Sequence, residues 1–218
     1  GADAAFDGEA RRTSPGRLDQ ECGPLWDEDP AFDVDLPSYG FEQVRLVINH
    51  GDTAGGHYKR WLKEHWPDVA AVVGPQHALP TPDFALNACQ QAWRTRVPEV
   101  LSTTSYVADQ ACAQLRELAG QPAPFFIQCS LPDPYHPFTP PGRFWDMFKP
   151  EAMALPESFN APHSGNLPHL DWMLAQRDQG RAVKNSPAMF AATAREVQEA
   201  LALNYGSIAH LDEAIGRV

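Results

Sequence analysis

The clearest periodic pattern along the chain lies in the stretch STTSYVADQACAQLRELAG, which begins at Ser102. Its apolar residues recur at spacings of three and four, as expected for one face of an α-helix. They are Val107, Ala111, Leu115 and Leu118. Hydroxyl residues at its start and Gly120 after its last turn suit the two ends of a helix. The pattern therefore predicts a helix over this stretch.

Two further segments show helical periodicity. Near the start, YKRWLKEH at residues 58 to 65 fits a short amphipathic helix with Trp61 and Leu62 facing inward, and Pro67 ends it. At the other end, residues 191 to 218 form a longer helical pattern with apolar residues on one face. These are Val197, Leu201, Tyr205, Ile208, Leu211 and Ile215.

Two apolar runs predict strands. FEQVRLVI at residues 41 to 48 alternates and then becomes continuously apolar, which suits a strand that passes into a core. PFFIQCS at residues 124 to 130 is too short for a helix and is bounded by prolines, so it is expected to be a buried strand of the parallel type. A helix, a strand and then a polar loop indicate an α/β arrangement, in which ligands gather at the carboxyl ends of strands.

These elements suggest that residues 1–218 form the central part of one domain. Residues 1–40 are an irregular leading segment, 41–148 an α/β portion, 149–190 an extended loop excursion and 191–218 a helix. The 21 prolines favour long connections, because proline collects in loops and at the ends of elements. The final helical pattern stops without a normal cap, so we expect an interior segment of a longer protein.

Composition narrows the classes of function. Hydrophobic residues make up 43% of the chain and charged residues 21%, as in an ordinary globular protein. A formal net charge of -11 argues against a nucleic-acid partner, which would need clustered Lys and Arg. No apolar run is long enough to span a membrane, and the first residues lack a signal-peptide core. Cytoplasmic and periplasmic or secreted locations both fit, and no oligomeric state is predicted.

The cysteines do not predict a metal site. The chain has four cysteines, at Cys22, Cys89, Cys112 and Cys129. They form no CxxC pair and are widely spaced, which disfavours a zinc cluster. Cys129 lies within an apolar run and is expected to be a small buried hydrophobic residue. His163 and His169 lie six residues apart without a supporting carboxylate, so they too are weak metal candidates.

The loop after the second predicted strand carries the first group of chemical candidates. Asp133, Tyr135 and His136 lie within four residues of one another, and Pro132, Pro134 and Pro137 stiffen the backbone around them. Such a group can supply hydrogen bonds or a proton to a bound anion. The alternative is structural, since proline-rich turns often carry one His and one Asp that cap backbone groups.

The glycine-rich stretch HGDTAGGHYKRW, residues 50 to 61, carries the second group. It places His50, Asp52, His57 and Lys59 around flexible backbone, where they could cradle an anion. The stretch matches neither a Walker loop nor a dinucleotide fingerprint. A solvated loop that caps the following helix explains it equally.

Two stretches together resemble the sulfatase family of the alkaline-phosphatase-like superfamily. PFFIQCSLPDPYHPFTPPGRFWDMF resembles the family's strand and histidine-proline loop, and ALNYGSIAHLDEAIGRV resembles its helix with a Y-x-x-x-I-x-x-x-D-x-x-x-G-R pattern. Tyr205, Asp212, Gly216 and Arg217 hold that pattern. The resemblance implies part of an α/β, alkaline-phosphatase-like domain, with a mixed sheet flanked by helices and long loops.

The family's nucleophile is a formylglycine made from a cysteine or serine in a C/S-x-P-x-R motif, beside a divalent cation such as calcium. Neither that motif nor the metal-binding motifs occur in this chain, so no metal ligand is assigned here. Cys112 and Arg116 have the C-x-x-x-R spacing, but they lack the proline and lie within a predicted helix. The resemblance implies that the nucleophile and the cation ligands lie elsewhere in a longer protein.

What the resemblance carries over is a histidine that contacts the sulfate or assists the leaving group. Strict alignment of the P-H-x-P loop puts Tyr135 at the family's histidine and His136 one residue later. Either His136 takes the role or Tyr135 supplies the hydrogen bond, and an imidazole is the better proton donor near neutral pH. Asp133, His57 and Lys59 are the candidate substrate-binding residues.

The implied reaction is hydrolysis of a small-molecule sulfate ester by the longer protein, with this segment inactive alone. A phosphonate monoester or phosphodiester hydrolase of the same superfamily is one alternative. A non-catalytic, sulfatase-like binding module is another, and the tyrosine at position 135 gives it some motivation.

Overall fold

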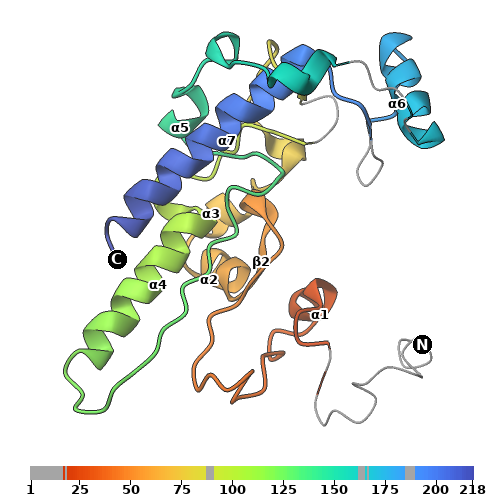
Figure 1. The fold of residues 1–218 in the computed structure, drawn as a ribbon. Coiled ribbons are helices and arrows are strands. Elements are labelled where there is room, and N and C mark those ends of the chain that lie inside the picture. The colour runs from red at the N-terminus through yellow and green to blue at the C-terminus, as the bar shows by residue number, and fades with distance from the viewer. Residues whose placement is uncertain (1–16, 18, 87–90, 162–164, 166, 185–189) are drawn as a thin grey trace.

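A computed structural model describes most of the chain (Figure 1). The described residues are 17, 19–86, 91–161, 165, 167–184 and 190–218. The first part of the predicted leading segment, residues 1–16, therefore lies outside them, as do Cys89 and His163.

Helices dominate the described residues. The α-helices are α1 (Gly23–Glu28), α2 (His57–His65), α3 (Pro67–Ala70), α4 (Thr103–Leu118), α5 (Arg143–Asp146), α6 (Pro168–Asp178) and α7 (Ala194–Ile215). Short 3-10 helices are η3 (Gly51–Thr53), η4 (Pro75–His77), η6 (Glu99–Leu101), η7 (Pro150–Ala152) and η8 (Glu157–Asn160). Strands β1 (Val47–Ile48) and β2 (Gly55–Gly56) pair antiparallel.

The three predicted helices are confirmed, and their ends form for the expected reasons. The Ser102 side chain accepts a hydrogen bond from the Ser105 backbone N–H at the start of α4. Thr193 begins α7 with a capping box, in which the Thr193 and Glu196 side chains each accept from the other's backbone N–H. Pro67 closes α2 and opens α3. The region predicted as a loop excursion also contains a helix, α6.

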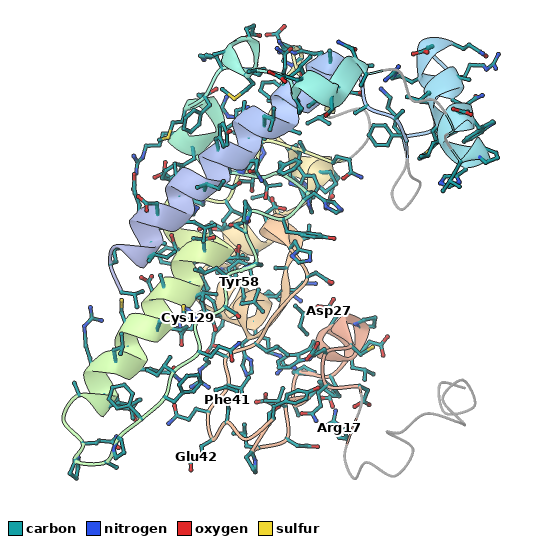
Figure 2. The ribbon with its side chains drawn as sticks, in the orientation of Figure 1. Arg17, Asp27, Phe41, Glu42, Tyr58 and Cys129 are labelled. Carbon is teal, nitrogen blue, oxygen red and sulfur yellow. The ribbon has the colours of Figure 1, made fainter. Side chains whose placement is uncertain are left out.

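The prediction of a buried strand at residues 124–130 is wrong. This segment is an extended connection beside α4, and Phe125 and Phe126 are 47% and 76% exposed. Cys129 is exposed as well, so its prediction as a buried residue is also wrong (Figure 2). The physical reason is that a strand exists only with a pairing partner, and no described strand lies against this one.

The sheet is small in the described residues. Of the predicted strand at residues 41–48, Val47 and Ile48 pair with Gly55 and Gly56 of the glycine-rich stretch, and Phe41 forms an isolated bridge with Ser38. Helices with a small sheet are compatible with an α/β class. The described residues contain one sheet of two strands. They do not contain the larger mixed sheet that the family resemblance implies.

One hydrophobic core lies between α2, η6 and α4. It consists of Ala54, Tyr58, Leu62, Val97, Leu101 and Tyr106. Tyr58 is fully buried, and its hydroxyl donates to the Leu101 carbonyl at 3.0 Å. Because a buried hydroxyl needs a partner, this bond fixes η6 against α2. The inward position predicted for Leu62 is confirmed.

A second core lies under α7, which is the long blue helix of Figure 1. Leu86, Ala92, Trp145 and Leu203 form it. The buried side of α7 is not the predicted one, since Leu203 is fully buried while Tyr205, Ile208 and Ile215 of the predicted apolar face remain 44–58% exposed. At Gly206 an added Cβ would lie 2.2 Å from the Phe144 carbonyl oxygen, so a small residue is needed where α5 meets α7.

Two carboxylates near the start of α7 are buried. Glu196 pairs with Lys184 and completes the capping box. Glu199 accepts from the backbone N–H groups of Ala85 and Leu86 at 3.0 and 2.9 Å. Arg195 also donates to Glu199, at 2.6 Å. Glu199 thus binds the segment around residue 85 to the helix.

His210 of α7 is buried against the start of α4. Its Nε2 lies 3.4 Å from both the Ser102 and the Ser105 hydroxyl oxygens, and its ring packs on Phe144 at 4.7 Å. Burial lowers the pKa of His210 to about 4, from 6.5. The carboxylates of Glu99 and Glu213 oppose this shift, and the guanidinium groups of Arg217 and Arg143 add to it.

This buried imidazole is expected to make the fold acid-labile. Below pH 6.5 the unfolded chain binds a proton that the folded chain does not bind until near pH 4. The contribution of His210 to the free energy of unfolding is therefore fully present above pH 6.5. It falls as the pH drops to about 4, by up to about 1.4 kcal/mol per pH unit. Urea unfolding at pH 7.5, 6 and 5 measures this slope.

The matched variant is His210→Gln, which keeps a polar side chain but does not titrate. Carboxylates and His57 titrate in both proteins, so the contribution of His210 is the difference between the two slopes. Equal slopes in the wild type and the variant between pH 6.5 and 5 would contradict the prediction.

Candidate functional site

The loop that holds Asp133, Tyr135 and His136 is fixed to the rest of the chain on both sides. Phe138 donates its backbone N–H to the Gln91 carbonyl at 2.8 Å, and Trp93 donates its N–H to the Phe138 carbonyl at 3.3 Å. Asn204 of α7 donates its side-chain amide to the Pro134 carbonyl at 3.2 Å. Two separate segments, residues 91–93 and α7, therefore set the position of this loop.

Three rings stack at the surface of the loop. The His50 ring lies 4.3 Å from the Tyr135 ring, with 35° between the ring planes. Tyr135 in turn lies 4.4 Å from the His136 ring, at 29°. These three residues are called the ring stack below. Tyr135 is 54% exposed and His136 is also exposed, so solvent or a ligand can reach the stack.

Asp133 points away from solvent and toward α4. Thr104 donates its hydroxyl hydrogen to the Asp133 carboxylate. Burial raises the pKa of Asp133, whereas the Thr104 bond and the charge of His50 oppose the rise. Asp133 also lines a small cavity of about 10 Å³, close to the space of one water molecule. Polar residues that share this cavity are Asp52, Thr95, Ser102, Thr103 and Thr139.

Asp52 anchors the glycine-rich loop from inside. Its carboxylate accepts from the Trp93 indole N–H at 3.0 Å and from the Thr95 hydroxyl at 2.5 Å. The Gly74 backbone N–H donates to it at 3.2 Å. The Asp52 side chain is thus buried and fully engaged in holding three segments together. Asp52 is therefore not part of a solvated loop, and its carboxylate is not free to help hold an anion.

His57 and Lys59 contact the leading part of the chain instead of the ring stack. His57 Nδ1 accepts from the Leu46 N–H at 2.9 Å, and its Nε2 lies 3.1 Å from Asp33. Burial lowers the pKa of His57, and Asp33 opposes this. Lys59 pairs with Asp27 of α1 at 2.7 Å; Asp27 is labelled in Figure 2. In the described residues no contact joins either of them to Asp133, Tyr135 or His136, and their substrate-binding role stays a prediction.

The sequence did not single out His50 as a partner of Tyr135. His50 lies two residues after β1 and directly before η3, 85 positions before Tyr135. The available signal was the glycine-rich loop at the end of a predicted strand, which is where α/β proteins gather ligand contacts. Only the packing of the two loops shows which residue of that stretch meets the Tyr135 ring.

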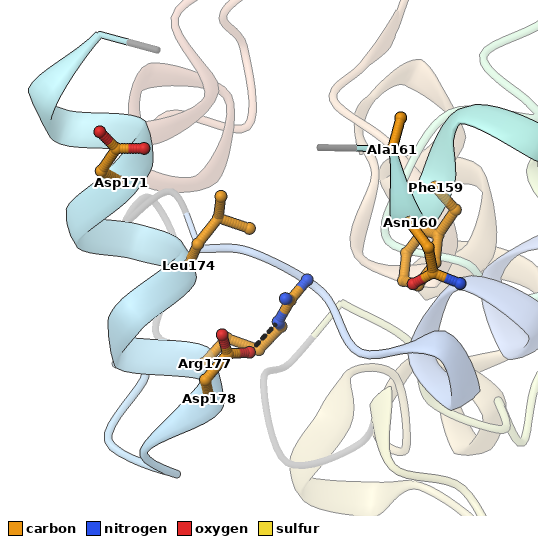
Figure 3. Close-up of a pocket in the computed structure, with 7 residues that line it drawn as sticks. All are labelled: Phe159, Asn160, Ala161, Asp171, Leu174, Arg177 and Asp178. Atoms are coloured by element: carbon orange, nitrogen blue, oxygen red, sulfur yellow. Dashed lines mark hydrogen bonds and ion pairs between the residues drawn. The ribbon is translucent and has the colours of Figure 1, made fainter. Parts of the chain in front are cut away.

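A second, wider hollow lies between η8 and α6 (Figure 3). Its volume is about 310 Å³. Phe159, Asn160, Ala161, Asp171, Leu174, Arg177 and Asp178 line it. Arg177 is already paired with Asp178 at 2.8 Å, as the dashed line in Figure 3 shows. None of the predicted site residues is among those that line this hollow.

Neither a metal cluster nor a membrane-spanning helix is found in the described residues. Across the described ranges, no group of three or more His, Cys, Asp or Glu side chains could hold a metal ion. The described residues therefore do not fit the cation that the family resemblance implies. None of the described helices has both the length and the apolar character needed to cross a membrane.

Comparison with known proteins gives one informative relative. The chain is 31% identical over 163 residues to an arylsulfatase of Clostridium perfringens (strain 13 / Type A). The match covers 73% of this chain and 29% of the arylsulfatase, so the chain spans less than a third of that protein. No protein-family model matches the chain. The match supports a sulfatase-like relationship.

Proposed function

We propose that this chain is part of a sulfatase-like hydrolase that cleaves small-molecule sulfate esters, and that the loop from Asp133 to Pro137 contributes to its anion site. The observation that carries the proposal is the 163-residue match to an arylsulfatase. Rigid placement of an exposed His and Tyr supports it, since a site that binds an anion needs fixed donors that solvent and substrate can reach.

Within this proposal His136 acts as the donor to the sulfate ester. Its ring is exposed, so a ligand can reach it. An imidazole can give its proton to the leaving oxygen as the sulfur-oxygen bond breaks, so that the alcohol departs neutral. Water supplies the oxygen that ends on sulfate. Tyr135 packs between two imidazole rings, which favours a supporting role for it.

The cation and the nucleophile of the proposed reaction come from outside the described residues. When bound, a divalent cation such as calcium would offset the charge of the sulfate group. The residues described here bind, orient and protonate the ester, and they supply no activated nucleophile. Cys112, the one candidate with suitable spacing to an arginine, lies on α4, where its thiol donates to the Arg217 carbonyl at 3.4 Å.

The 218-residue chain is accordingly expected to be inactive by itself. The purified chain, supplied with calcium and a chromogenic aryl sulfate, should release phenol no faster than buffer does. A longer protein that contains a C/S-x-P-x-R motif should turn the same substrate over. Activity of the isolated chain that survives repurification would contradict the location of the nucleophile. An inactive longer protein would instead favour the non-catalytic alternative.

A further inference from the structure

His50 is held in place by features that do not involve its own side chain. It follows Asn49, which has a positive φ of 65°, and it precedes Gly51, which has a φ of 64°. An added Cβ on Gly51 would lie 3.1 Å from the Thr139 hydroxyl oxygen and 3.2 Å from the Pro137 ring. The backbone beside His50 is therefore pressed against the loop that follows His136.

The next residue along the chain locks the same loop from the inside. Asp52 binds Trp93, Thr95 and the Gly74 backbone, as described above. Trp93 is itself bonded through its backbone to Phe138. The glycine-rich loop and the histidine loop are thus fixed to the same segment, so the distance between them cannot change without breaking buried bonds.

The His50 side chain meets two of the candidate residues at this junction. Its ring packs on Tyr135, and its charge acts on the nearby Asp133 carboxylate. Its Nδ1 is buried and has no hydrogen-bond partner among the described residues. A buried polar atom without a partner is uncommon, and such atoms often mark functional positions. His50 is therefore more than a loop residue at the surface.

We propose that His50 is a positioning residue of the anion site: by stacking on Tyr135 it fixes the ring on which His136 is stacked, and so sets the orientation of the His136 imidazole. The importance of that orientation for catalysis rests on the proposed function, whereas the coupling of the three rings does not. His50 touches neither the ester nor the cation in this account. It acts only through Tyr135.

The physical basis is the geometry of the stack. Tyr135 is more than half exposed, so much of its ring surface faces solvent. The two imidazole rings contact it at 4.3 and 4.4 Å. Removal of the His50 ring takes away one of the two ring contacts that Tyr135 makes and leaves the contact with its neighbour His136. Misplacement of a reacting group by about 1 Å can lower a rate by up to about 10²-fold.

Nuclear magnetic resonance of the isotope-labelled 218-residue chain tests the coupling without any need for activity. In the wild type, ring protons of His50 and Tyr135 should show a mutual Overhauser effect, and so should those of Tyr135 and His136. In His50→Ala, the ring-current displacement of the His136 protons should shrink by at least half. His50→Phe keeps a flat ring and should restore it. His169→Ala, at an exposed position on α6, is the matched control and should change nothing.

Three results would overturn the proposal. One is the absence of the His50–Tyr135 Overhauser effect in the wild type, a measurement that depends on no variant and so remains decisive if His50→Ala does not fold. Another is an unchanged His136 spectrum in a folded His50→Ala chain. A third is a His50→Phe chain that behaves like His50→Ala, because the stacking would then not be what matters.

The catalytic arm uses the longer protein. There His50→Ala should lower kcat by about 10- to 10²-fold with little change in KM, and His50→Phe should stay within about threefold of the wild type. A longer protein with no turnover at all would count against the proposed function and leave the resonance result standing. An active longer protein in which His50→Ala has wild-type kcat would overturn the positioning role.

Discussion

Replacement of His136 by alanine in the longer protein is expected to lower kcat for an aryl sulfate by about 10²- to 10⁴-fold, the usual contribution of a positioned acid or base. The reason is that no other described imidazole on this loop can protonate the leaving oxygen. His50 is the other imidazole of the stack, but it belongs to the glycine-rich loop and not to this one. Steady-state kinetics with a chromogenic aryl sulfate measure the effect.

Tyr135→Phe is the discriminating variant. It removes the hydroxyl but keeps the ring between the two imidazoles, so kcat is expected to fall less than about tenfold, the loss of one modest hydrogen bond. A larger loss for Tyr135→Phe than for His136→Ala would assign the family's histidine role to Tyr135 instead. The exposed His169→Ala serves as the control for general damage. Substrates with a poor leaving group should show the His136 effect most strongly, because they depend most on protonation.

Glu199→Ala is expected to lower the free energy of unfolding by about 2–5 kcal/mol, because two backbone N–H groups inside the protein lose their acceptor, at about 1–3 kcal/mol each. Its carboxylate is fully buried and accepts three hydrogen bonds. Without it, the backbone N–H groups of Ala85 and Leu86 lose their acceptor inside the protein, and Arg195 loses its buried partner. Urea unfolding at pH 7.5, followed by tryptophan fluorescence, measures the change.

Two matched variants make this test specific. Glu199→Gln keeps one acceptor oxygen and should lose clearly less stability than Glu199→Ala. Asp212→Ala lies on the exposed side of the same helix and should change the free energy of unfolding by no more than about 0.5 kcal/mol. Equal losses for Glu199→Ala and Asp212→Ala would show that Glu199 is not what holds the segment around residue 85. If Glu199→Ala is too unstable to purify, the other two variants still test the prediction. Glu199→Gln should then lower the free energy of unfolding more than Asp212→Ala does.

Local sequence determined the helices because their signals lie within the helices themselves. Ser102 caps the first turn of α4 and Pro67 ends α2, as their positions along the chain predict, and Thr193 caps α7 in the same way. The loop from Asp133 to Pro137 was also visible, since its prolines, acid, tyrosine and histidine are neighbours in the sequence. Such features depend on residues a few positions apart, and a single sequence contains all that they need.

The strand prediction at residues 124–130 failed for the opposite reason. An apolar run indicates that burial of the segment would be favourable. A strand also needs a backbone partner from another segment, and the described residues do not provide such a partner. The buried side of α7 was equally hidden. Its periodic apolar residues point to one side, yet Glu199, Gly206 and His210 make the close contacts, because their partners come from segments distant in sequence.

The sequence by itself thus determined where helices begin and end, which loop carries exposed chemical groups, and the resemblance that the arylsulfatase match supports. Only the tertiary structure decided which residues share a site. It separated His57 and Lys59 from the histidine loop by pairing them with Asp33 and Asp27, and it brought His50 against Tyr135. The physical reason is that contacts between distant segments follow from the packing of whole elements, which no local pattern encodes.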